Sequence, residues 1–319
     1  MIIFEDYTEL PEKFRNSSIA IGNFDGMHRG HCEVIRRAGM FAHERGLPWG
    51  VLTFEPHPRE VFNKTEPLFR LTSFEMKARQ IKVMGVDFLV VIQFDDEFAK
   101  ISADEFVNQI LVQGFEASYI VSGFNFAFGY KRAGNTDFLQ RKGKQFGFGT
   151  TGIKQVLDDE GEIISSTRIR KFLAEGNTSA AAKLLGRNFE FEGTISHGEQ
   201  RGRKIGFPTA NIELTDNIRT ATGVYAIKAG IDHGLGVVWH DGIANLGYRP
   251  TFNGEKCVLE THLFDFNEEI YGSNLRVAMI EFIRSEKKFD GVQSLTAQIR
   301  KDISQSRLIL ARKQTEEYI

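Results

Sequence analysis

Short apolar runs alternate with longer amphipathic stretches between residue 17 and about residue 186. Apolar runs of about four to eight residues are typical of strands, and an amphipathic stretch between two of them is typical of a crossover helix in a parallel sheet. The runs that we interpret as strands are residues 18–21, 50–54, 87–94 and 118–122. Helices are predicted at residues 31–45 and 102–112, the second opened by a capping box of Ser102 and Glu105. The pattern predicts a doubly wound α/β domain.

The pattern changes after a helical stretch at residues 167–185, where Gly186 can end the helix in a left-handed cap. Beyond it, short apolar runs are separated by glycine-rich turns without intervening helices, which is typical of an antiparallel β-barrel. The predicted strands are residues 189–195, 224–230, 236–245, 259–266 and 275–284, and a final helix with one apolar stripe is predicted at residues 292–313. We therefore expect two domains, residues 1–186 and residues 187–319.

The composition is that of a globular protein with two cores. The chain has 319 residues, more than one core usually organises, and 41% of them are hydrophobic. A formal net charge of −2 gives no overall field for nucleic acid or anionic lipid, so we expect neither as a partner. Cys32 and Cys257 are too few for a disulfide framework, and no signal peptide or membrane span is visible. We expect a cytoplasmic protein, and its oligomeric state stays open.

The first predicted strand runs into a glycine-rich segment, residues 22–31, of sequence Gly-Asn-Phe-Asp-Gly-Met-His-Arg-Gly-His. A loop between a strand and a helix start can bind phosphate, because free N–H groups and the helix dipole face the anion. His28 and His31 can then donate hydrogen bonds to phosphate oxygens as negative charge develops at an α-phosphorus. The alternatives are a turn with two surface histidines and a zinc site, for which no third ligand lies nearby. The position at the carboxyl end of a strand favours a ligand site.

A second cluster opens the last helix of this half, with the sequence Ser-Ser-Thr-Arg-Ile-Arg at residues 165–170. Hydroxyls and N–H groups at a helix start, followed by arginines, can hold a triphosphate and neutralise departing pyrophosphate. The same segment can be an ordinary helix N-cap followed by solvated arginines. In combination with the histidine segment, it favours nucleotide chemistry.

The second half contains a long glycine-rich and basic segment, residues 193–211, that ends in Pro-Thr-Ala-Asn. Glycines and basic side chains suit a flap over phosphates, and Thr209 and Asn211 supply oxygen ligands suitable for Mg²⁺. A hairpin loop with solvated charges is one alternative. A nucleic-acid site at the basic residues 201–204 is another, but their neighbours are glycines and not aromatic residues on which bases could stack.

The run at residues 259–266 alternates as an antiparallel strand does. Alternation places one face at Glu260, His262 and Phe264 and the other at Thr261, Leu263 and Asp265. One face can therefore line a site. The Glu260 carboxylate can act there as a general base, or it can be an exposed cross-strand charge.

Several of these strings resemble those of known families. Residues 28–31 together with 165–170 resemble the nucleotidyltransferase superfamily, which includes the class I aminoacyl-tRNA synthetases. The strings at residues 22–31, 53–58 and 123–129 are similar to those of the bacterial bifunctional riboflavin kinase/FAD synthetase family. Residues 193–211, 242–251 and 259–266 resemble the riboflavin kinase signature of the same family. The resemblance covers nearly the whole chain and implies a Rossmann-like nucleotidyltransferase domain followed by a kinase barrel with a C-terminal helix.

The resemblance also implies roles for individual residues. It implies catalytic roles for His28, His31 and Glu260, with Glu260 taking the proton of the riboflavin 5′-hydroxyl. The residues implied to bind ATP in the adenylyltransferase half are Gly22, Phe24, Asp25, Gly30, Asn125, Ser165, Thr167 and Arg168. The residues implied to bind ATP or flavin in the kinase half are Gly198, Arg203, Gly206, Pro208, Thr209, Asn211 and Arg284, of which Thr209 and Asn211 are also the implied Mg²⁺ ligands. His57 and Cys32 are given no role.

The family implies two reactions, phosphorylation of riboflavin to FMN and adenylylation of FMN to FAD, with ATP as co-substrate and Mg²⁺ as cofactor. One alternative keeps the nucleotidyltransferase chemistry but changes the acceptor, and the complete kinase signature argues against it. Another alternative is a flavin-binding sensor that has lost catalysis. The intact histidines and Glu260 argue against that sensor.

Overall fold

The computed structural model describes residues 1–8, 10–63, 68–196, 202, 205–214, 219–232, 236–251 and 254–316. The chain divides into two compact units, Met1–Ser166 and Thr167–Ile319. Within the described ranges, none of the helices has the length and apolar character that crossing a membrane requires.

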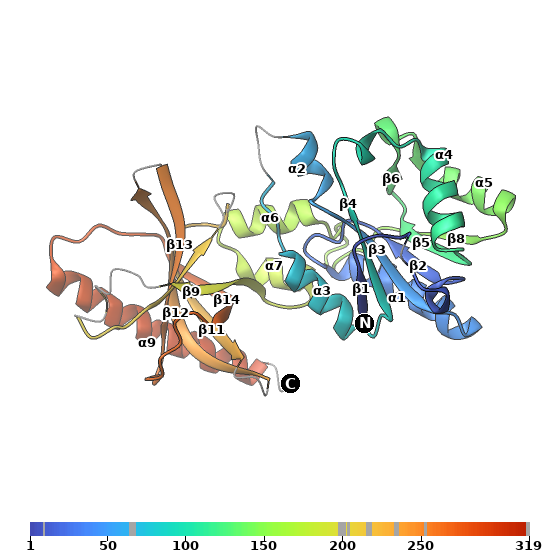
Figure 1. Ribbon diagram of the computed structural model, residues 1–319. Coiled ribbons are helices and arrows are strands. Elements are labelled where there is room, and N and C mark those ends of the chain that lie inside the picture. The colour runs from blue at the N-terminus through green and yellow to red at the C-terminus, as the bar shows by residue number, and fades with distance from the viewer. Residues whose placement is uncertain are drawn as a thin grey trace. The chain divides into compact units, whose positions relative to one another are not determined.

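A six-stranded parallel sheet forms the centre of the first unit (Figure 1). Its strands are β1 (Ile2–Phe4), β2 (Ser18–Ile21), β3 (Trp49–Glu55), β4 (Phe88–Gln93), β5 (Tyr119–Gly123) and β8 (Gly149–Ile153), in the order β1-β4-β3-β2-β5-β8. β2 pairs with β3 on one side and β5 on the other, so the carboxyl ends of these three strands lie side by side. All four predicted strands are confirmed, whereas β1 and β8 have no counterpart among the predictions.

Helices cover both faces of this sheet, as the doubly wound prediction requires. In β2, Ile19 and Ile21 belong to one hydrophobic core and Ala20 to the other. The helices are α1 (Arg29–Arg45), α2 (Pro58–Phe62), α3 (Phe74–Val83), α4 (Ala103–Glu105) with its π-helical continuation η3 (Phe106–Gly114), and α5 (Thr136–Phe146). Residues of α1 and α3 pack on the Ala20 side, and residues of η3 and α5 pack on the other. The shorter elements are η1 (Glu12–Phe14), η2 (Phe98–Lys100), β6 (Ala127–Phe128), η4 (Tyr130–Arg132) and β7 (Gly134–Asn135).

Capping explains where two of these helices begin. α1 begins two residues before the predicted start, because the His28 Nδ1 atom accepts a hydrogen bond from the His31 N–H at 3.2 Å and caps the first turn. At α4, the Ser102 hydroxyl accepts from the Glu105 N–H at 3.1 Å, and the Glu105 carboxylate accepts from the Ser102 N–H at 2.8 Å. The predicted capping box is therefore confirmed.

The second unit is built on a closed antiparallel barrel (Figure 1). Its strands are β9 (Phe189–Ser196), β10 (Ala210–Leu214), β11 (Gly223–Asp232), β12 (Val237–Thr251), β13 (Gly254–Leu263) and β14 (Asn274–Arg284), in the order β10-β13-β12-β11-β14-β9. The predicted barrel and its five predicted strands are confirmed. β10 has no predicted counterpart, because its first two residues belong to the segment interpreted as a phosphate-binding flap.

Two short helices, α6 (Ser166–Ala174) and α7 (Thr178–Leu185), replace the single helical stretch that the sequence predicts at residues 167–185. The break lies at Gly176, whose φ is +75°, and Gly186 ends α7 in the predicted left-handed cap. α7 packs with the barrel, because the Thr178 hydroxyl donates to the Ile280 carbonyl at 2.9 Å. The compact units thus divide at Ser166, and the functional boundary at residue 186 stays a prediction.

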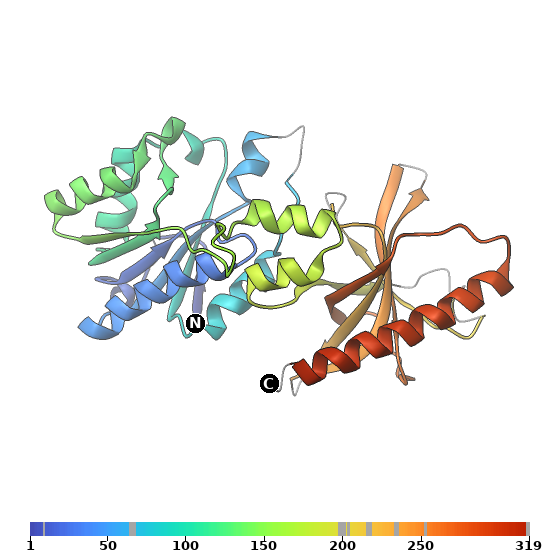
Figure 2. The same ribbon diagram turned by 180° about the vertical axis from the view of Figure 1, so that it is seen from behind.

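The C-terminal helix α9 (Val292–Glu316) lies along the barrel (Figure 2). Ile309 and Leu310 of this helix join a hydrophobic cluster with barrel residues that include Val224 and Ile280. Leu310 is completely buried, whereas Leu308, two positions earlier, is 75% exposed. One stripe of the helix therefore faces the barrel, as predicted.

We expect Leu310→Ala to lower the free energy of unfolding by about 2–5 kcal/mol, because it removes buried methyl groups and leaves a cavity. Leu308→Ala is the matched control and should change this free energy by less than about 0.5 kcal/mol. Urea denaturation followed by circular dichroism measures both. Equal effects of the two substitutions would contradict the orientation of α9.

Candidate functional site

The loop at residues 22–28, which connects β2 to α1, has an unusual backbone. Phe24 and Met27 have φ values of +52° and +43°, and Gly26 has a φ of +90°. A left-handed conformation costs a non-glycine residue on the order of 1–3 kcal/mol, so surrounding contacts must hold it. At Gly26 a Cβ atom would also lie 2.8 Å from the Leu71 Cδ1 atom, so a larger residue there would have to displace the Leu71 side chain as well as adopt a left-handed conformation.

The Asp25 side chain holds this loop in place. Its carboxylate is 4% exposed, and its Oδ1 atom accepts hydrogen bonds from the N–H groups of Leu71 at 2.9 Å and Thr72 at 3.2 Å. The Gly26 N–H donates to the Thr72 hydroxyl oxygen at 3.1 Å, and the Ser166 hydroxyl donates to the Asp25 carbonyl at 2.9 Å. Asp25, for which ATP binding is predicted, thus anchors the loop to the segment that precedes α3.

The two histidines lie together at the end of the loop. The imidazole rings of His28 and His31 stack with their centroids 3.6 Å apart, and the Phe24 ring meets His31 edge-on at 5.6 Å. Because the His28 Nδ1 atom accepts a hydrogen bond, the neutral ring carries its proton on Nε2, which is then a donor. A Cβ atom at Gly30 would lie 3.1 Å from this ring, and one at Gly22 would lie 2.9 Å from the Phe24 ring. Both glycines therefore leave room for aromatic rings of the site.

The other residues predicted for this site come from two further segments. Asn125 follows β5, the neighbour of β2, and its side chain is exposed at the same edge of the sheet. Ser165 directly precedes the serine whose hydroxyl binds the loop. Thr167 and Arg168 begin the second compact unit, and their part in a nucleotide site stays a prediction.

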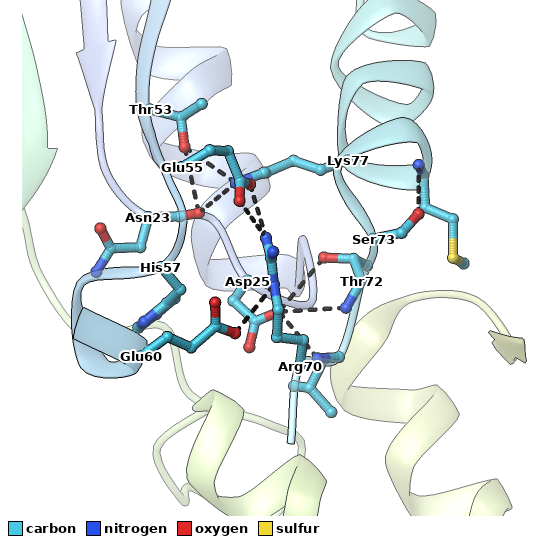
Figure 3. Close-up of polar contacts among 12 residues, drawn as sticks. Asn23, Asp25, Thr53, Glu55, His57, Glu60, Arg70, Thr72, Ser73 and Lys77 are labelled. Carbon is cyan, nitrogen blue, oxygen red and sulfur yellow. Dashed lines mark hydrogen bonds and ion pairs between the residues drawn. The ribbon is translucent and has the colours of Figure 1, made fainter. Parts of the chain in front are cut away.

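An ionic cluster around the buried Lys77 lies beside the loop (Figure 3). The Lys77 ammonium, on α3, is 2.7 Å from a carboxylate oxygen of Glu55, and the Arg70 Nη2 atom is 2.7 Å from each Glu55 oxygen. Burial lowers the pKa of Lys77, and the charge of Glu55 opposes this shift. Burial also raises the pKa of Glu60, which lies 3.6 Å from Arg70. None of these four residues has a predicted role.

The barrel contains a second candidate site, a cavity of about 590 Å³. It brings together four residues predicted for the kinase half, namely Thr209, Asn211, Glu260 and Arg284. Polar residues without a predicted role also line it, namely Asn245, Arg249, His262, Glu286, Lys287 and Asp302.

Strand register explains why these side chains meet. Asn211 of β10 and Asn245 of β12 both pair directly with Glu260 of β13, and Ser196 of β9 pairs with Asn211. Directly paired residues of antiparallel strands place their side chains on the same face, so these four form one row across the barrel. Asn245 is absent from the predicted residues, although pairing its strand with residues 254–263 as a hairpin would have placed it beside Glu260.

A smaller cavity of about 400 Å³ lies on the other face of β13. Glu260 and His262 line the larger cavity, whereas Thr261 and Leu263 line the smaller one. The predicted alternation is therefore confirmed for residues 260–263, up to the end of β13. Thr209 borders both cavities. A molecule in one cavity and a molecule in the other would therefore approach each other at Thr209.

The remaining residues predicted for the kinase half differ in position. Pro208 lines the smaller cavity, and its carbonyl oxygen lies 2.8 Å from the His262 Nδ1 atom. Gly206 is exposed in a turn with a φ of +88°. Gly198 and Arg203 lie outside the described residues.

Two arginines of the larger cavity are held by carboxylates. Arg249 donates to an oxygen of Glu260 through Nε, at 3.1 Å, and through Nη2. Arg284 binds Asp302 of α9 through both Nε, at 3.0 Å, and Nη2, at 2.7 Å. Asp302 is only 3% exposed. Arg284, predicted to bind ATP or flavin, therefore fastens the end of β14 to the C-terminal helix.

Two family profiles match consecutive parts of the chain. The profile described as FAD synthetase matches residues 10–168, and the profile described as riboflavin kinase matches residues 185–310. The first segment contains the loop at residues 22–28, which carries His28 and which we call the histidine loop. The second segment contains the barrel cavity.

Curated relatives match over nearly the whole chain, and three share the description bifunctional riboflavin kinase/FMN adenylyltransferase. The Bacillus subtilis protein is 39% identical and the Escherichia coli K12 protein 38% identical, covering 92% and 89% of this chain and 92% and 90% of their own. The Haemophilus influenzae protein is 41% identical over 90% of this chain and 92% of its own. A crystal structure described as a macrolide-efflux protein from Streptococcus pneumoniae is 33% identical, with a TM-score of 0.80, over 94% of this chain and 96% of its own.

We expect Asp302→Asn to lower the free energy of unfolding by about 3 kcal/mol, because it leaves the largely buried Arg284 without its charged partner. Glu281→Gln is the matched control, since it removes the charge of an exposed pair with Arg312 and should change stability by less than about 1 kcal/mol. Urea denaturation of both variants measures the difference. If Asp302→Asn lowered the free energy of unfolding no more than Glu281→Gln does, the result would contradict the anchoring role of Arg284.

Proposed function

Because this chain belongs to the bifunctional riboflavin kinase/FMN adenylyltransferase family, we propose that its two reactions take place at the two sites described above. The chain phosphorylates riboflavin to FMN with ATP, and it adenylylates FMN to FAD with a second ATP. We assign adenylylation to residues 1–186 and phosphorylation to residues 187–319. The strongest support is that Glu260 and Asn211 pair directly on the wall of the barrel cavity, while the two histidines stack at a helix start.

In adenylylation, a phosphate oxygen of FMN attacks the α-phosphorus of ATP, and pyrophosphate leaves. No protein nucleophile is needed, so the protein acts by positioning and by stabilising charge. The His28 Nε2–H and the N–H groups at the start of α1 are donors for the developing negative charge. We assign His31 to the same charge, and Ser165, Thr167 and Arg168 to the departing pyrophosphate.

In phosphorylation, the riboflavin 5′-oxygen attacks the γ-phosphorus of ATP, and ADP leaves. Glu260 is the only carboxylate in the row of paired residues, so we assign it the role of the general base that accepts the hydroxyl proton. We place the flavin in the larger cavity and the nucleotide in the smaller one, whose wall includes Ile195, Leu263 and Phe266, apolar side chains against which an adenine ring can pack. The γ-phosphate then lies at Thr209, which borders both.

The chemistry of Thr209 and Asn211 fits a Mg²⁺ ion. The Asn211 side chain is 5% exposed, and its amide nitrogen donates to the Thr209 carbonyl at 3.4 Å. Its Oδ1 atom is buried and accepts no hydrogen bond from any residue that the structure describes. An amide and a hydroxyl oxygen are hard ligands that suit Mg²⁺, which binds few protein groups alongside nucleotide phosphates. When bound, Mg²⁺ neutralises phosphate charge.

We also propose a cytoplasmic location, because both reactions use ATP.

We expect His28→Asn to slow FAD formation from FMN by about 100-fold or more, because it removes a donor to the transition state. Asparagine is itself a good N-cap, so this substitution preserves the first turn of α1.

Glu260→Gln should slow FMN formation from riboflavin by about 100-fold or more, because an amide cannot accept the proton. Chromatographic separation of flavins over time, with Mg²⁺-ATP and either riboflavin or FMN, measures both rates.

In each variant, the reaction of the other site is the internal control and should keep its rate. Loss of both reactions in a folded His28→Asn protein would contradict two separate sites. A Glu260→Gln protein that makes FMN at the normal rate would show that the general base is another group.

We expect Asn211→Ala to raise the Mg²⁺ concentration for half-maximal riboflavin phosphorylation by about tenfold or more, as loss of a metal-binding group does. The Mg²⁺ dependence of FAD formation from FMN should not change. Glu213→Ala is the matched control, because Glu213 lies on the same strand but is exposed. Mg²⁺ titrations of both reactions test this, and an unchanged requirement would contradict the assigned metal site.

A further inference from the structure

The ionic cluster beside the histidine loop contains a lysine that binds the loop itself (Figure 3). The Lys77 ammonium donates to the Asn23 carbonyl at 3.1 Å and approaches the Thr53 hydroxyl oxygen at 3.2 Å and Glu55 at 2.7 Å. The Thr53 hydroxyl in turn donates to the same Asn23 carbonyl at 3.3 Å. All three N–H groups of the ammonium therefore have a partner, and one partner is the loop backbone.

The stability of the fold does not explain why this residue carries a charge. Lys77 is only 2% exposed, and removing an ammonium from water is costly even beside a carboxylate. An apolar side chain of similar volume in place of a buried ion pair is often neutral or stabilising. Glu55 would keep a charged partner without Lys77, because both of its oxygens accept from Arg70. The contact that only Lys77 supplies is the one between its charge and the Asn23 carbonyl.

That carbonyl directly precedes the strained part of the loop, which begins at Phe24. Asp25 fastens the loop a second time, through the N–H groups of Leu71 and Thr72. Residues 71–77 thus hold the loop at two points, through backbone N–H groups at Asp25, within the left-handed stretch, and through the Lys77 ammonium at Asn23, just before it. Such a loop keeps one geometry only where its surroundings determine it.

We propose that Lys77 is a positioning residue for FMN adenylylation, which fixes the Asn23 carbonyl and thereby the loop that carries His28. The proposal rests on the assignment of adenylylation to the histidine loop. In this role, Lys77 acts through the backbone between Asn23 and His28. A misplacement of a catalytic group by about 1 Å, caused by a substitution far from the reacting atoms, can slow a reaction by about 100-fold.

Lys77→Met in the full chain tests this, because methionine fills a similar volume without a charge or donor. We expect kcat for FAD formation from FMN to fall by about 100-fold, while KM for FMN changes little. Riboflavin phosphorylation by the same preparation should not change. Lys82→Met is the matched control, since Lys82 lies on the same helix but is exposed, and it should leave both reactions unchanged.

A second variant separates positioning from simple neutralisation of Glu55. If Lys77 only neutralised Glu55, the double variant Lys77→Met/Glu55→Gln would recover the normal kcat. We expect it to remain as slow as Lys77→Met, because the Asn23 carbonyl still lacks its charged donor. Recovery of kcat in the double variant, or a normal kcat in Lys77→Met, would overturn the proposal.

Should Lys77→Met fail to fold, Lys77→Gln removes the same contact. Glutamine is polar, as this cluster requires, but it is shorter than lysine and carries no charge to place against the Asn23 carbonyl. We expect kcat to fall with KM for FMN preserved, and a normal kcat would overturn the proposal. If the wild-type chain makes no FAD from FMN, the assigned function fails, whereas an active wild type with equally active variants refutes only the role of Lys77.

Discussion

The pairing of β2 between β3 and β5 is the constraint on which the first site depends. Parallel strands end at one edge of a sheet. The histidine loop, the end of β3 with Thr53 and Glu55, and the turn that contains Asn125 therefore meet there, although they are far apart in the sequence. The loop itself is strained, and strands alone would not hold it. The carboxylate of Asp25 and the segment before α3 supply the missing contacts. The site therefore requires the sheet and a helix together.

The barrel reaches the same result by antiparallel register. Alternation along β13 sends successive side chains to two different cavities, and direct pairing with β10 and β12 surrounds Glu260 with two asparagines. Because Thr209 borders both cavities, a phosphoryl acceptor in one cavity and a phosphoryl donor in the other can meet at this residue without a deep common pocket. A shift of β13 by one residue would exchange the two faces and remove Glu260 from the row.

Much of the fold and of the two candidate sites could be predicted from the sequence. The spacing of apolar residues indicates which positions are buried, and the motifs are long. Four of the six strands in the sheet, five of the six in the barrel, the capping box at Ser102 and the alternating faces of residues 260–263 all follow from local pattern. Strand β10 could not be predicted in this way, because its five residues are continuous with a glycine-rich segment that has no strand pattern. Lys77 could not either, because a lysine in a short amphipathic helix has the same pattern whether its charge is solvated or buried.

A resemblance assigns a residue to a site, but the contacts determine how it acts there. Asp25 and Arg284 are both predicted to bind substrate, yet each binds another segment of the same chain. For Arg284 the partner is Asp302, a nearly buried carboxylate on a helix whose apolar stripe is its only predicted feature. Charged residues at such positions transmit the geometry of a distant element to the site. Their substitution therefore affects folding and catalysis together, and only a measurement that separates kcat from stability distinguishes them from residues that touch substrate.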